Sequence, residues 1–63
     1  MFTRKEVEYQ IFLLIRGVEA PESISPEEEE EFIENLEAAY QTKFIGDEIY
    51  NRVKKYFIQK NKN

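Results

Sequence analysis

Apolar residues recur at helical spacing in three segments of the chain. In the first segment, the residues that share one helical face are Val7, Ile11, Leu14, Ile15 and Val18. In the second they are Phe32, Ile33, Leu36, Ala39 and Tyr40, and in the third Ile45, Ile49, Tyr50, Val53, Tyr56 and Phe57. This pattern predicts an all-α fold, a small three-helix bundle with helices over about 3–17, 26–43 and 47–60. The bundle forms a single domain over residues 1–63 that ends in a frayed tail at 61–63.

The residues between the apolar segments agree with these boundaries. Ser25 is followed by Pro26 and, three residues after the serine, by Glu28. This order is typical of an N-cap, a first helical position and the acid of a capping box. Gly17 is predicted to end the first helix, and Gly46 to supply the flexible position of the second turn.

Several apolar residues of the first helix fall outside its predicted core stripe. Phe2, Tyr9 and Leu13 form a second line along this helix, and Phe12 lies beside that line. A helix that is apolar on more than one side is either central in its fold or part of an interface. Two interpretations therefore stay open. Either the first helix lies between the other two, or these four residues bind a protein partner or a second copy of the chain.

The composition removes several classes of chemistry. The 63 residues include neither cysteine nor histidine, which excludes thiol nucleophiles, zinc–thiolate sites and the commonest general base. The serines and threonines have no histidine to activate them, and there is no glycine-rich phosphate loop. We therefore expect a protein that is not an enzyme, with no catalytic residue, cofactor or metal site. The sequence has no apolar run long enough to span a membrane and no secretion signal, so a cytoplasmic protein is expected.

The net charge of −4 conceals an acidic middle and a basic end. Residues 19–48 carry ten glutamates and one aspartate against one lysine, whereas residues 49–63 carry five basic residues and no acid. Acidic residues are favoured in the first turn of a helix, so one interpretation of the glutamate run is simply a solvated helix start. The other is a surface for a basic protein partner. Its candidate residues are Glu27, Glu30, Glu31 and Glu34.

Basic and aromatic residues alternate in the third helix, as they do in many proteins that hold single-stranded nucleic acid. The candidate phosphate contacts are Arg52, Lys54, Lys55 and Lys60. However, Tyr56 and Phe57 also belong to the predicted core, and basic residues suit the C-terminal end of any helix. Nucleic acid is therefore the less favoured partner.

These patterns together predict a small non-enzymatic protein-interaction module, such as an adaptor or inhibitor of phage or mobile-element type. It would act through the apolar face of the first helix and the acidic second helix. Its partner would be another protein or a second copy in a homodimer.

Overall fold

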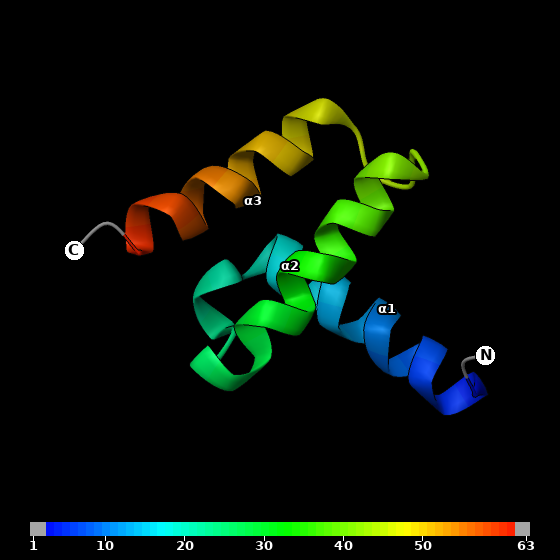
Figure 1. Ribbon diagram of the computed structural model, residues 1–63. Coiled ribbons are helices and arrows are strands. Elements are labelled where there is room, and N and C mark those ends of the chain that lie inside the picture. The colour runs from blue at the N-terminus through cyan, green and yellow to red at the C-terminus, as the bar shows by residue number, and fades with distance from the viewer. Residues whose placement is uncertain (1–2, 62–63) are drawn as a thin grey trace.

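The computed structural model describes residues 3–61, and Figure 1 shows how they are arranged. The chain forms the elements α1 (Arg4–Glu19), η1 (Pro21–Ser23, a short 3₁₀ turn), α2 (Pro26–Gln41) and α3 (Asp47–Lys60). The predicted all-α fold with three helices is confirmed, and residues 3–61 contain no strand. Two expectations, the surface role of Phe2 and the fraying of residues 62–63, lie outside the described residues.

The helices begin where local chemistry predicts. Thr3 caps α1, because its hydroxyl oxygen accepts a hydrogen bond from the amide of Glu6 at 3.2 Å. A capping box begins α2, where the amide and the hydroxyl of Ser25 each donate to Oε1 of Glu28 at 3.1 Å. Gly46 is the N-cap of α3. The hydrogen bonds at Thr3 and Ser25 satisfy polar groups at the helix ends, where the backbone has no hydrogen-bond partner within the helix.

α2 ends two residues earlier than predicted, in a Schellman motif. The amide of Phe44 donates to the carbonyl of Ala39 at 2.8 Å, and the amide of Lys43 donates to the carbonyl of Tyr40 at 3.1 Å. The motif requires one residue in the left-handed region. Here it is Lys43, with φ 64°, and not Gly46, with φ −89°. The two hydrogen bonds fix Phe44 directly after the helix.

The three helices meet around Phe32 of α2. Its side chain is fully buried, and its ring centroid lies 5.4 Å from that of Phe57 on α3. α1 crosses this ring at Gly17, where an added Cβ atom would overlap the ring of Phe32. Only glycine therefore allows α1 to approach so closely. The other buried side chains of the core are Leu13, Leu14, Ile24, Leu36, Ala39 and Val53.

Two predictions for α1 are wrong for the same reason. Leu13, assigned to a spare surface, is fully buried, and Gly17, assigned to the helix stop, lies inside α1 against Phe32. The helix is turned about its axis by roughly one residue, or ~100°, from the predicted orientation. This places the glycine side of α1 on the core. The predicted core residues Val7, Ile11 and Ile15 are consequently exposed.

A polar cluster joins α2 to α3 beside the core. The rings of Tyr40 and Tyr50 stack with their centroids 4.0 Å apart, and the Tyr40 hydroxyl donates to Oδ1 of Asp47 at 2.6 Å. The Tyr50 hydroxyl donates to Oε2 of Glu37 at 2.6 Å, and Nζ of Lys54 donates to the same oxygen at 3.1 Å. The hydrogen bond between tyrosine and carboxylate lowers the pKa of Glu37 and raises the pKa of Tyr50. These contacts fix the position of α3 on α2.

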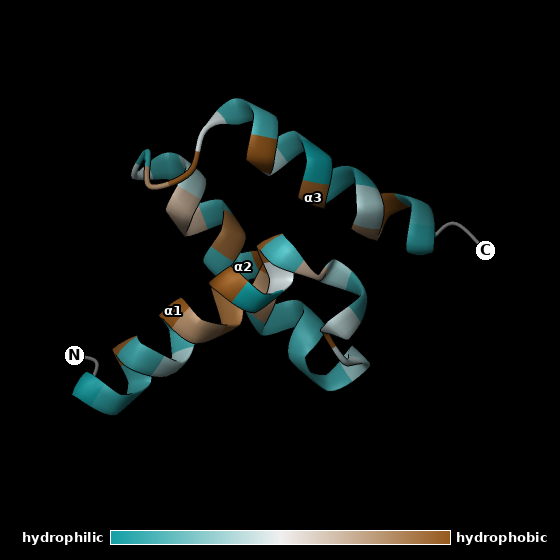
Figure 2. Cartoon of the chain, turned by 180° about the vertical axis from the view of Figure 1, so that it is seen from behind, coloured by the Kyte–Doolittle hydropathy of each residue, from teal (hydrophilic) through white to brown (hydrophobic). Residues whose placement is uncertain are grey.

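The molecule is more open than a tightly packed bundle. Its radius of gyration is 11.5 Å, whereas roughly 10.6 Å is expected for a compact domain of this length. α3 meets α1 near the C-terminal end of α1, where the Arg52 guanidinium lies 3.5 Å from the carbonyl oxygen of Val18. The N-terminal half of α1 projects away from α3 (Figure 1) and carries apolar positions along its length (Figure 2).

The contact between Gly17 and Phe32 predicts a large effect of a very small substitution. Gly17→Ala should gain about 1 kcal/mol in helix propensity. However, the new methyl group has to displace a buried ring, and overpacking of this kind costs about 1–3 kcal/mol or more. Because the added Cβ atom would overlap several ring atoms of Phe32, we expect a cost at the upper end of this range and a net loss of about 2 kcal/mol. Urea unfolding followed by circular dichroism would measure this loss.

Gly46→Ala is the matched control, because nothing lies within 4 Å of a Cβ atom at that position. It should change the free energy of unfolding by less than about 1 kcal/mol. If the free energy of unfolding of Gly17→Ala were equal to or higher than that of the wild type, Gly17 would not determine the separation between α1 and α2.

Candidate functional site

The main exposed apolar surface of the described chain follows one side of α1. Val7, Ile11 and Ile15 are 42%, 45% and 48% exposed and lie one helical turn apart; we call them the α1 stripe. Single exposed apolar residues are common on protein surfaces, but an aligned series of them on a projecting helix is typical of an interaction surface. The stripe is therefore the first candidate site.

The end of α2 forms a second wall beside the α1 stripe. A groove of about 200 Å³ runs between Val7 and Ile11 on one side and Ala38, Ala39 and Phe44 on the other. The Schellman motif holds Phe44 at this rim, where its side chain is 69% exposed. Such a shallow apolar groove, open along one helix, has the form that an amphipathic helix fills.

The four residues predicted as an apolar binding surface separate in the structure. Phe12 is 59% exposed, with the Arg16 guanidinium over its ring at 5.6 Å from the centroid. Tyr9 is also exposed, and it lies beside Glu31 of α2. Leu13 belongs to the core and cannot contact a partner. Two of the four residues, Tyr9 and Phe12, are therefore on the described surface.

The glutamates at the start of α2 divide into two groups. Glu28 pairs with Arg16, and Glu29 accepts from Nδ2 of Asn61 at 3.0 Å and lies 3.9 Å from Nζ of Lys60. The others are exposed and take part in none of the ion pairs within residues 3–61. We call these the acidic face: Glu27, Glu30, Glu31 and Glu34. Within residues 3–61, no three acidic side chains are arranged to hold a metal ion.

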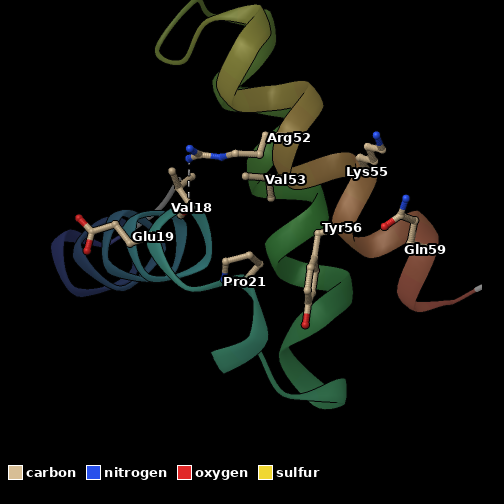
Figure 3. Close-up of a pocket in the computed structure, with 8 residues that line it drawn as sticks. All are labelled: Val18, Glu19, Pro21, Arg52, Val53, Lys55, Tyr56 and Gln59. Atoms are coloured by element: carbon tan, nitrogen blue, oxygen red, sulfur yellow. Dashed lines mark hydrogen bonds between the residues drawn. The ribbon is translucent and has the colours of Figure 1, made fainter.

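The candidate phosphate contacts of α3 also divide. Lys54 pairs with Glu37 at 3.1 Å, and Lys60 lies 3.9 Å from Glu29, so α2 carboxylates balance both charges. Arg52 and Lys55 instead line a groove of about 600 Å³ between α3 and the end of α1 (Figure 3). The remaining residues of this groove are Val18, Glu19, Pro21, Val53, Tyr56 and Gln59.

Sequence patterns did not assign the α1 stripe or Phe44 to the surface. The stripe residues were placed in the core because they have helical spacing, which buried and interface residues share. The available signal for α1 was Gly17, since an internal glycine marks the side on which another element approaches closely.

Among residues 3–61, no helix combines the length and the apolar character needed to cross a membrane. Comparisons with protein families, with curated protein sequences and with solved structures gave no match.

The Arg16–Glu28 pair makes the stability of the fold depend on pH. The hydrogen bond from Arg16, aided by the Ser25 amide, lowers the pKa of Glu28 from 4.5 to about 2. Since this pKa is lower in the folded chain, the carboxylate stabilises the fold above pH 4.5, and this contribution disappears as the pH falls through about 2. Glu28→Gln should therefore be less stable than the wild type at neutral pH. This difference in the free energy of unfolding should disappear as the pH falls to about 2.

Urea midpoints of the two proteins, measured from neutral pH down to the acid limit, provide the test. Glu30→Gln is the matched control, because it removes the same charge from an exposed position on the same helix and should leave the midpoint nearly unchanged. A constant difference between wild type and Glu28→Gln over the whole pH range would contradict the role assigned to the ion pair.

Proposed function

We propose that this chain is a non-enzymatic protein-interaction module that binds a protein partner through the α1 stripe. One observation carries the proposal: Val7, Ile11 and Ile15 lie in line on the projecting half of α1 and remain 42–48% exposed. A chain of 63 residues has little apolar surface to spare, because small domains bury only about 60% of their unfolded surface. The exposure of an aligned series of large apolar residues in the single chain is explained if a partner covers them in a complex.

The structure offers one charged region that would orient such a partner. The acidic face lies on α2, whose C-terminal half forms the second wall of the groove. A basic segment of a partner would be attracted to it from a distance, and such attraction affects the association rate more than the final affinity. In this proposal the α1 stripe supplies the affinity and the acidic face guides the approach.

The test compares Ile11→Glu with the wild-type chain as bait in an extract of the source organism. Ile11 is the central residue of the stripe, and its side chain is 45% exposed, so a charge there should leave the fold intact. We expect the wild type to retain a partner and the variant to lose it, with at least a tenfold loss of affinity, or about 1.4 kcal/mol. Isothermal titration with the identified partner would measure the loss.

Ile58→Glu is the matched control. Ile58 is 56% exposed and belongs to the last turn of α3. This end of α3 lies on the opposite side of the molecule from the start of α1 (Figure 1). The same substitution there should preserve binding. Equal binding by wild type and Ile11→Glu would exclude the α1 stripe as the binding surface.

Single-stranded nucleic acid binding is the second candidate function. It is favoured by one observation, the groove that Arg52, Lys55 and Tyr56 line together (Figure 3). Phosphate contacts and stacking on an aromatic ring are the usual combination for such ligands. The ion pairs of Lys54 and Lys60 with α2 reduce the positive charge available for this purpose.

A titration with a short thymidine oligonucleotide at low salt tests this candidate. If the groove binds it, Lys55→Gln should weaken binding and reduce the salt dependence by about one phosphate contact, a slope change of about 0.7. Lys43→Gln removes one charge from the α2–α3 turn and should have little effect. Absence of binding by the wild type at low salt would exclude the candidate.

A further inference from the structure

Some of the charges at the ends of α1 are contrary to the usual preference of a helix. Cations are favoured near a helix C-terminus and anions near its N-terminus. α1 follows this preference with Glu6 in its first turn and Arg16 in its last, but it also begins with Arg4 and Lys5 and ends with Glu19. Arg4 does pair with Glu8 at 3.3 Å, but its side chain is 93% exposed, and an exposed pair in this order contributes little. Within residues 3–61, neither the helix dipole nor a strong ion pair accounts for the positions of Arg4 and Glu19.

The same charges are complementary to those of a second α1 in the opposite direction. Arg4 and Glu19 are separated by fifteen residues, or about 22 Å along the helix, with the α1 stripe between them. If two such helices lie antiparallel with Ile11 at the centre, Arg4 of each copy lies beside Glu19 of the other. The opposed helix dipoles also favour this direction.

The apolar residues fit the same arrangement. Arg4, Val7, Ile11, Ile15 and Val18 recur every three or four residues, which is the spacing of a helix–helix seam. In the antiparallel pairing Ile11 contacts Ile11 of the second copy, and Val7 contacts Ile15. Phe44 stands at the rim of the groove near Val7, where the second helix would present its Ile15.

From these observations we propose that two copies of the chain associate through antiparallel α1 helices, with Arg4 paired to Glu19 of the second copy across a two-fold axis at Ile11. This inference rests on the proposed function, because it names the partner of the α1 stripe. An isologous contact of this kind closes after two copies, so the product is a dimer and not a fibre.

Sedimentation equilibrium over a wide concentration range, up to roughly 1 mM, is the first test. The wild-type mass should rise from 7.6 kDa towards twice that value. Ile11→Glu should stay monomeric with unchanged helicity, while Ile58→Glu should dimerise like the wild type. A wild type that is monomeric throughout would overturn the dimer.

Charge exchange tests the direction of the helices. Arg4→Glu and Glu19→Arg each place two like-charged pairs in the interface and should weaken dimerisation roughly tenfold. The double variant Arg4→Glu/Glu19→Arg restores both pairs and should recover most of the affinity. If the double variant were weaker than either single variant, the antiparallel pairing would be excluded.

Cross-linking provides a second measure, since the chain has no cysteine of its own. Under oxidation, two copies of the Ile11→Cys variant should become joined by a disulfide. A mixture of the Arg4→Cys and Glu19→Cys variants should form mixed disulfide-linked dimers. Arg4→Cys alone should not cross-link, because its two copies lie about 22 Å apart. Efficient cross-linking of Arg4→Cys alone would indicate parallel helices and overturn the proposal.

The outcomes distinguish this inference from the proposed function. A monomeric wild type that still retains a different protein through Ile11 excludes the homodimer and leaves the interaction module in place. A monomeric wild type that retains no protein through Ile11 excludes both.

Discussion

The arrangement of this molecule depends on the contact between a glycine and a phenylalanine ring. Gly17 lets α1 lie directly on Phe32 of α2, and the same ring packs against Phe57 of α3. One buried ring thus contacts all three helices. Because the contact requires the glycine side of α1 to face the core, it determines which apolar residues of that helix remain outside. The exposed α1 stripe is a direct consequence of this packing.

The sequence predicted the parts of the fold that depend on neighbouring residues. The start of α2 follows from Ser25 with Glu28, since a cap is completed within one turn of helix. The buried face of α2 was also predictable, because its acidic residues leave only one apolar side. No such contrast exists on α1, where apolar residues occupy several sides, so periodicity alone could not select the face that packs.

The errors have physical causes that lie outside local sequence rules. Gly17 was interpreted as a helix stop because glycine is common there, whereas its role depends on Phe32, fifteen residues further along the chain. The left-handed residue of the α2–α3 turn is Lys43, although Gly46 would adopt that conformation more easily. Backbone hydrogen bonds from Lys43 and Phe44 to α2 select the position of the turn. Of the predicted partner surface, the acidic face, Tyr9 and Phe12 are exposed as expected, while Leu13 is in the core.

The proposed pairing of Arg4 with Glu19 of a second copy also has an evolutionary consequence. Arg4 and Glu19 lie at opposite ends of one rigid helix and cannot touch within a chain. If they meet only between copies, a charge reversal at one position would be tolerated best when the other reverses too. The two positions would then vary together across related sequences despite their separation in the monomer. Such covariation would be evidence of the dimer that can be obtained from the sequences of single chains.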